Sequence, residues 1–163
     1  MLSFLKKKEN KEIILGAVAE GELIKLQDVP DPVFSQKMMG DGIALRIKSG
    51  DICAPVDGSI TLIAETKHAF GMTGADGVEI MVHVGLETVN LKGAGFTPLV
   101  KIGDRVKRGT PVLRVDYAVM KEHHIELITP IIVLNHQQFS ITELYRNRVV
   151  QVNDDLLKLT KVQ

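Results

Sequence analysis

Glycine-containing turn signals interrupt the chain at short intervals from about residue 13 onward, in segments such as "KSGD", "PVDG" and "GADG". Between them lie β-rich pieces at residues 58–63, 78–85, 111–115 and 130–134. Short strands at roughly ten-residue spacing are typical of a β-sandwich or barrel rather than of alternating strands and helices. Helix formers without β-branched runs predict only short helical turns, within residues 31–39 and 118–126. The sequence therefore predicts an all-β, antiparallel, sandwich or barrel-like fold.

The length of 163 residues suits one domain, which we place at residues 13–163 behind a flexible tail at residues 1–12. Lys and Arg together number 20, as do Asp and Glu, so no global charge favours nucleic acid or anionic lipid. The single cysteine, Cys53, excludes an internal disulfide and fits a reducing, cytoplasmic compartment. No apolar run approaches the roughly 20 residues that a membrane helix needs.

The N-terminal tail allows two interpretations. Leu2, Phe4 and Leu5 precede three lysines, and this order differs from that of a signal peptide, in which the charges come first. The apolar residues could rest on an anionic membrane surface as a weak tether. Alternatively, the tail is frayed and solvated.

The stretch "GVEIMVHVGLETV" at residues 77–89 reads as a strand that carries a histidine. Alternation along a strand gives one buried face to the aliphatic residues Val78, Ile80, Val82 and Val84. Glu79, Met81 and His83 then point to the other side. The sequence thus places an imidazole on the outward face of a rigid strand.

A second histidine stands in "GSITLIAETKHAFGM". A period of two places Thr66 and His68 on one face, within reach of a hydroxyl-to-imidazole hydrogen bond. If this strand lies beside the strand of His83, the two rings could face each other across a shallow depression. Its apolar rim would be formed by Phe34, Phe70, Met72 and Met81.

Such a histidine pair has three chemical uses. A neutral ring can accept a phosphoryl group while the other donates a hydrogen bond to the phosphate oxygens. The pair could also ligate zinc, although a zinc site usually has a third protein ligand, and none stands at a convincing spacing unless a partner supplies it. General acid–base catalysis is the third use, and it would require a substrate pocket.

Residues 77–89 resemble the active-site signature of the glucose-family IIA proteins of the bacterial sugar phosphotransferase system. The signature has a glycine, three aliphatic residues at 80–82, and then His83, Val84, Gly85, Leu86, a free position, Thr88 and Val89. Three further blocks match in the expected order: "VPDPVFSQKMMGDGIA" at 29–44, "APVDGSI" at 54–60 and "ETKHAF" at 65–70. The resemblance runs from about residue 15 to 160.

The resemblance implies a phosphotransferase component with a fold of the duplicated hybrid motif type. Proteins of this family take a phosphoryl group from the phosphocarrier HPr and pass it to the IIB domain of a membrane sugar permease. By resemblance, Nε2 of His83 accepts the phosphoryl group while Nδ1–H donates to a backbone carbonyl. His68 assists the transfer, and Thr66 holds His68. No cofactor or metal is implied, the expected state is a monomer, and the IIB and IIC parts are expected on separate chains.

Partner contacts are also implied. An apolar collar that excludes water and receives the partner proteins is expected from Phe34, Phe70, Met72 and Met81, with plain core packing as the alternative for the last three. Gly85 would allow close approach of backbone or phosphate beside His83. Asp31 and Glu87 are expected to pair with a basic residue of HPr; the family usually has aspartate at position 87, which makes that pairing looser here.

Two other families share parts of the pattern. The segment 103–121 has the turn of biotinyl and lipoyl carrier domains, with Lys121 in place of the modified lysine. However, Lys121 lies five positions after Asp116, and the surroundings look helical. Zinc peptidases of the lysostaphin type need two histidines at alternate positions of a strand. Here His123 and His124 are adjacent, so they would point to opposite faces. Both readings are disfavoured.

Overall fold

Every strand pairing within residues 12–163, the part of the chain that this computed structural model describes, is antiparallel. The prediction of an all-β fold with a few short helices is confirmed. The predicted tail lies outside the described residues, except for Glu12, which begins the first strand. Within the described part, no helix is both long and apolar enough to cross a membrane.

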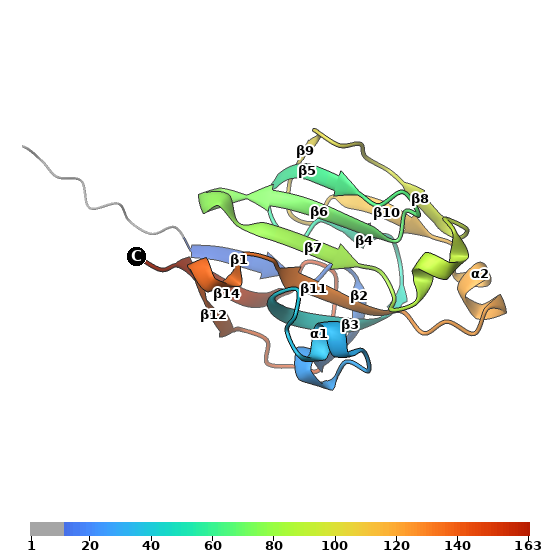
Figure 1. The fold of residues 1–163 in the computed structure, drawn as a ribbon, viewed down its shortest axis with the longest axis horizontal. Coiled ribbons are helices and arrows are strands. Elements are labelled where there is room, and N and C mark those ends of the chain that lie inside the picture. Colours follow the sequence, from blue (N-terminus) through green and yellow to red (C-terminus); the bar gives the residue numbers. More distant parts are fainter. Residues whose placement is uncertain (1–11) are drawn as a thin grey trace, which may run out of the picture.

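The strands form one large and two small sheets (Figure 1). In order across the sheet, the large one contains β13 (Val149–Val150), β2 (Glu20–Lys25), β3 (Asp41–Ser49), β11 (Ile128–Val133), β7 (Glu79–His83), β6 (Ala69–Gly74), β5 (Gly58–Ile63) and β9 (Arg105–Val106). One small sheet contains β1 (Glu12–Gly16), β14 (Asp155–Lys161) and β12 (Phe139–Glu143). The other contains β4 (Ile52–Cys53), β10 (Pro111–Val115) and β8 (Phe96–Pro98).

The helices are short connections between these strands. The α-helices are α1 (Pro32–Ser35) and α2 (Tyr117–Glu122). Four 3-10 turns complete the described part: η1 (Leu26–Asp28), η2 (Ala75–Gly77), η3 (Thr88–Leu91) and η4 (His136–Gln138). Lys121 therefore lies on a helix and not at a hairpin tip, as a carrier domain would require. His123 and His124 follow the same helix and are exposed.

The main core joins the large sheet to both small ones. Ile60, Phe70 and Val82 from the large sheet share one cluster of buried side chains with Leu113 of β10 and Leu157 of β14. The predicted buried face of β7 is confirmed, because Val78, Ile80, Val82 and Val84 are all at most 1% exposed. Burial of this aliphatic surface is the main driving force that holds the sandwich together.

A second, smaller core covers the other face of the large sheet. Leu26 of η1, Phe34 of α1 and Val29 between these elements share this core with Met81 and Ile132. The prediction that Met81 points to an open surface is therefore wrong. Alternation placed Met81 correctly on the second face, but the segment 26–35 covers the strand at Met81, whereas Glu79 is exposed and His83 is partly exposed at the two ends of β7.

Candidate functional site

His83 and His68 meet where β6 and β7 lie side by side. In their antiparallel register His83 is opposite Ala69, so the preceding residue, His68, lies at the same end of the pair. The backbone N–H of Val84 donates to the carbonyl of His68 at 2.7 Å and fixes this alignment. The ring centroids are 4.8 Å apart and the planes meet edge to face at 76°. The prediction that the two rings face each other is confirmed.

The His83 ring is oriented by the backbone two residues further along. Its Nδ1 lies 2.6 Å from the carbonyl oxygen of Gly85. Because a carbonyl oxygen can only accept a hydrogen bond, Nδ1 carries the hydrogen, and Nε2 of the neutral ring keeps its lone pair. Gly85 has a φ of +79°, a conformation that L side chains rarely adopt, and a Cβ there would lie 2.5 Å from Cγ2 of Thr88. A glycine is therefore required at this position.

Two buried threonines that the sequence analysis gave no role support the Gly85 turn. The hydroxyl of Thr88 donates to the carbonyl of Val84 at 2.5 Å. The backbone N–H of Gly85 donates to Oγ1 of Thr129 at 3.3 Å, and that hydroxyl donates to Leu127. Both threonines are 0% exposed. Thr129 is the one hydroxyl residue in the apolar run "ITPIIV". Because a buried hydroxyl needs hydrogen-bond partners, this position in the sequence could have indicated a supporting role.

His68 is held by the hydroxyl of Thr66, whose Oγ1 lies 2.6 Å from Nδ1 of the ring. The predicted contact exists, but its predicted cause is wrong. β5 ends at Ile63 after an irregularity between Ile60 and Leu62, and residues 64–67 form a turn in which Lys67 has a φ of +62°. Thr66 and His68 thus meet across a turn rather than along one face of a strand.

Phe34 forms an apolar wall beside the site. Its ring lies 5.3 Å from the His83 ring between centroids, tilted by 58°. The local sequence explains this position: Asp31 caps α1 by accepting from the N–H of Val33, and Pro32 supplies a fixed φ at the first turn. The capped turn directs Phe34 into the smaller core, where it is only 4% exposed.

The residues expected to form an exposed apolar collar are buried. Phe70 and Met72 are each 1% exposed and belong to the main core, because β6 directs them between the sheets. Phe34 and Met81 are also buried, so they support the site from beneath rather than offer a free surface. The exposed apolar side chains near Phe34 are those in and after α1: Val33, Met38 and Met39. Sequence alternation could not separate these from the buried residues.

Both active-site candidates have a lowered pKa. Desolvation is the main cause for His68, and the neighbouring His83 lowers its pKa further. Desolvation is also the main cause for His83, where it outweighs the opposite effects of the Gly85 carbonyl and of the Asp31 carboxylate. The neutral, nucleophilic form of each ring is thereby favoured at neutral pH.

Of the two predicted acidic residues, Asp31 is close enough to His83 to affect the pKa of its ring. Asp31 and Glu87 line a hollow of about 380 Å³ together with His123, His124 and Glu126. The position of the adjacent histidines next to the two carboxylates was not predicted. In the described residues, no group of three or more His, Cys, Asp or Glu side chains has a geometry that could hold a metal ion.

Residues 13–139 match the family described as phosphoenolpyruvate-dependent sugar phosphotransferase system, EIIA 1. The chain is 44% identical over 148 residues to the PTS system glucose-specific EIIA component of Oceanobacillus iheyensis, covering 91% of this chain and 88% of that protein. It is 43% identical over 156 residues to the glucose-specific EIIA component of Haemophilus influenzae, covering 94% of both. Against a glucoside-specific EIICBA component of Staphylococcus carnosus it is 46% identical over 138 residues, and it spans only 20% of that protein.

A solved structure has the same architecture. The glucose permease IIA of Mycoplasma capricolum superimposes with a TM-score of 0.83 at 37% sequence identity, covering 91% of this chain and 96% of that one. The sandwich fold therefore agrees with a structure of a related protein, as well as with the sequence pattern.

Proposed function

The chain belongs to the EIIA 1 family of the phosphoenolpyruvate-dependent sugar phosphotransferase system and is a phosphoryl carrier of that system, and we propose that His83 is the residue that carries the phosphoryl group. The single observation that supports this most strongly is the contact between Nδ1 of His83 and the carbonyl of Gly85. It leaves Nε2 as the only nucleophilic atom of the ring, at a position that is partly exposed at the end of β7.

The proposed charging step is an in-line exchange between two nitrogen atoms. The Nε2 lone pair of His83 forms the new P–N bond while the P–N bond of the donor, phospho-HPr, breaks. No proton has to leave His83, because its hydrogen is on Nδ1 and remains bonded to Gly85. In the discharging step a cysteine thiolate of a IIB domain forms a P–S bond while the P–N bond breaks and its electron pair returns to Nε2 of His83. Such steps require positioning and charge stabilisation rather than covalent help from the carrier.

His68 serves as the assisting group in this proposal. In this proposal the Thr66 hydroxyl, whose Oγ1 lies 2.6 Å from Nδ1 of His68, donates to that nitrogen, which places the hydrogen of the neutral ring on Nε2. With the two rings in edge-to-face contact, this N–H can reach an oxygen of a phosphoryl group on His83. A donor placed where charge develops stabilises the transition state, and its removal typically slows a reaction by about 10²–10³-fold.

The surface around His83 fits two successive protein partners. Val33, Met38 and Met39 are 39%, 70% and 37% exposed, in and after the helix α1 whose Phe34 lies against the His83 ring. Asp31 is close enough to act on His83 and shares a hollow with Glu87, and in this proposal both carboxylates steer a cationic partner surface. We propose that phospho-HPr and the IIB domain dock here in turn, and that their contact shields the phosphohistidine from water.

The remaining features of the proposal follow from the family. We place the carrier in the cytoplasm as a monomer, and its lone, buried Cys53 suits a reducing compartment. A glucose-type permease is the proposed recipient, because relatives with 44% and 43% identity are called glucose-specific.

The proposal is tested by incubating the full chain with phosphoenolpyruvate, enzyme I and HPr, and then mapping the acid-labile phosphate. We expect one phosphoryl group, located on His83, and none on the His83→Ala variant. Label on another residue, or undiminished label in His83→Ala, would contradict the assignment. The matched control is His136→Gln, which removes a histidine of the 3-10 turn η4 and leaves the candidate site intact.

A further inference from the structure

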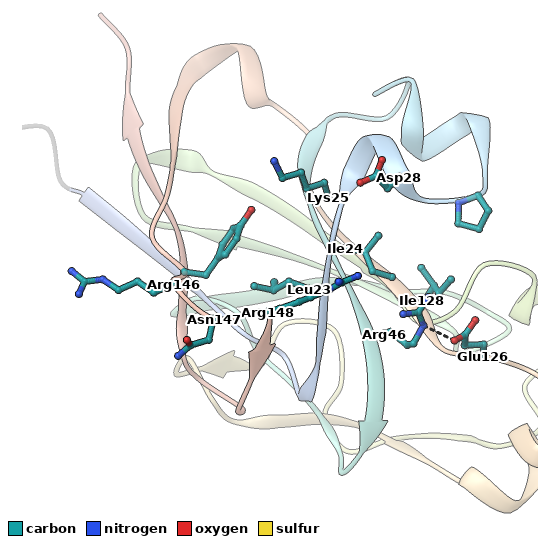
Figure 2. Close-up of a pocket in the computed structure, with 12 residues that line it drawn as sticks. Leu23, Ile24, Lys25, Asp28, Arg46, Glu126, Ile128, Arg146, Asn147 and Arg148 are labelled. Atoms are coloured by element: carbon teal, nitrogen blue, oxygen red, sulfur yellow. Dashed lines mark ion pairs between the residues drawn. The ribbon is translucent and has the colours of Figure 1, made fainter.

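A groove of about 700 Å³ lies on the opposite side of β11 from the histidine pair (Figure 2). Its walls are residues of β2, Arg46 of β3, the start of β11 and the segment 145–148 that leads into β13. This volume is in the range of sites for small molecules. The phosphoryl-transfer reaction proposed above does not use this groove.

Four charged side chains form a linked row along one wall. One carboxylate, Glu22, pairs with two guanidinium groups: Oε1 lies 2.8 Å from Nε of Arg148, and Oε2 lies 3.5 Å from Nη1 of Arg46. Arg46 also pairs through Nε with Glu126, as the dashed line in Figure 2 marks. The row is balanced in charge, and Glu22 links the two arginines.

Arg148 retains unused donors. Its only pairing within the described residues is through Nε, so Nη1 and Nη2 have no protein acceptor there. The side chain is 77% exposed, and it therefore meets no steric barrier to an incoming anion. Two parallel N–H groups of a guanidinium match two oxygens of a phosphate or carboxylate, and this charge-assisted geometry is the strongest that the side chain can form.

The rest of the lining restricts the ligand further. Apolar and aromatic surface suits the nonpolar face of a ring, and the half-buried side chains of Ile24 and Tyr145 supply it, while Leu23 and Ile128 line the groove but are each only 6% exposed. Asn147, Asp28 and Glu126 offer acceptors for hydroxyl groups. Around the groove, four cationic side chains stand against three carboxylates including Glu22, and Arg146 extends away from the other two arginines (Figure 2). Such a small positive excess suits one anionic group on an otherwise neutral polar molecule, not a polyanion.

We propose that this groove is a binding site for a small phosphorylated polyhydroxyl compound of the sugar phosphate class. The phosphate binds Nη1 and Nη2 of Arg148, and the ring lies against the apolar wall with its hydroxyls toward the carboxylates and Asn147. Pro30, Glu126 and Ile128 line both the groove and the hollow that contains Asp31 and Glu87. A bound molecule therefore lies next to the proposed partner surface without touching His83.

The test is a nuclear magnetic resonance titration of the unphosphorylated full chain with glucose 6-phosphate, inorganic phosphate and glucose. We expect glucose 6-phosphate to produce saturable shifts in the amides of β2 and of residues 144–150, with weaker shifts from inorganic phosphate and none from glucose. Arg148→Gln should weaken binding about tenfold or more, because a hydrogen bond to a charged group is lost. Arg148→Lys, which keeps the charge but not the paired donors, should have an intermediate affinity.

The matched control is Arg114→Gln, since Arg114 is also an exposed arginine in a single ion pair, with Asp51, but lies on β10 of another sheet. Its affinity should equal that of the unchanged chain. The proposal is overturned by an absence of saturable shifts up to about 10 mM, a concentration that would detect even weak complexes. Equal binding by Arg148→Gln, equal binding of inorganic phosphate or glucose, or shifts confined to the histidine pair would also overturn it. Because no phosphoryl transfer is measured, these outcomes are independent of the role of His83.

Discussion

Nδ1 of His83 lies 2.6 Å from the carbonyl oxygen of Gly85, and this contact determines which ring nitrogen is available to a partner protein. The turn that supplies the carbonyl depends on a glycine with a φ of +79° and on the buried hydroxyls of Thr88 and Thr129. The reactive atom is thus fixed by backbone geometry. Five expected outcomes follow from this arrangement and from the surface around it.

Changing His68 should separate charging from discharging. In the variant His68→Gln we expect His83 still to accept a phosphoryl group, since its own orientation depends on Gly85 and not on His68. Transfer to the IIB domain should be about 10²–10³-fold slower, because the glutamine amide lacks the rigid ring that Thr66 holds and cannot place a donor at the phosphate oxygens in the same way. Rapid-quench measurement of both half-reactions checks this. Equal rates of discharge in His68→Gln and in the unchanged protein would rule out an assisting role.

Thr66 should act as a positioning residue for His68. Removal of its hydroxyl in Thr66→Val leaves Nδ1 without the partner at 2.6 Å, so the two tautomers of the ring become comparable in population. We expect a slower discharge, by about tenfold for the loss of one such hydrogen bond, together with a change in the ring nitrogen shifts. Thr66→Ser keeps a hydroxyl and should restore both properties. A slower rate with an unchanged tautomer would point to a purely structural effect.

Replacing Gly85 should displace the carbonyl that orients His83. In Gly85→Ala the new Cβ meets Thr88 at 2.5 Å in a left-handed backbone conformation, so the turn must shift. We expect a loss of about 1–3 kcal/mol in the free energy of unfolding and slower charging. Gly103→Ala is the matched control, since its φ of +96° is also left-handed but nothing lies within 4 Å of a Cβ there. Comparable charging rates in the two variants would contradict the role of the turn.

The stability of the domain should fall on the acid side of neutrality because of the two histidines. Burial lowers the pKa of both rings from 6.5, so below that pH the unfolded chain binds more protons than the folded chain. The free energy of unfolding should therefore decrease as the pH falls from 6.5 toward the folded pKa values, with the histidine contribution complete above 6.5. Urea unfolding across this range checks it. The double variant His68→Gln, His83→Gln should have a shallower decline, and an identical slope would contradict the account.

The apolar patch after α1 should affect docking but not chemistry. Met38 is 70% exposed, so Met38→Asp should leave the fold intact while placing a charge in the proposed contact with HPr. We expect the concentration of HPr for half-maximal charging to rise about tenfold, with little change in the maximal rate. Ile102→Asp is the control, because Ile102 is 59% exposed in a different loop, between β8 and β9. A similar effect of both variants would remove the argument for a specific patch.

Sequence patterns predicted the fold and the histidine pair because both depend on local periodicity and on short motifs. Strand limits were correct at Gly58–Ile63 and Pro111–Val115, where turn residues stand on both sides. Simple alternation correctly predicted that Val82 lies on the buried face of its strand and that His83 lies on the opposite face. The position of His68 beside His83 depended on which strands are neighbours, and the motif order of the family supplied that information.

The errors arose where distant segments determine burial. Met81 and Phe34 were expected at an open surface, but both belong to the smaller core that the segment 26–35 helps to build, which no local pattern reveals. Thr66 and His68 were assigned to one strand, whereas a strand irregularity and a turn at Lys67 bring them together. Ion pairs such as Glu22 with Arg148 join residues far apart in sequence and could not be predicted from spacing.

The atom that bears the phosphoryl group provides the most direct test of the central claim. The full chain, labelled with nitrogen-15 in its histidines, is charged by HPr and examined by nitrogen and phosphorus magnetic resonance under alkaline conditions. We expect phosphorus coupled to Nε2 of His83, with the hydrogen of the same ring on Nδ1. Phosphorus on Nδ1 of His83, or on either nitrogen of His68, would contradict the account.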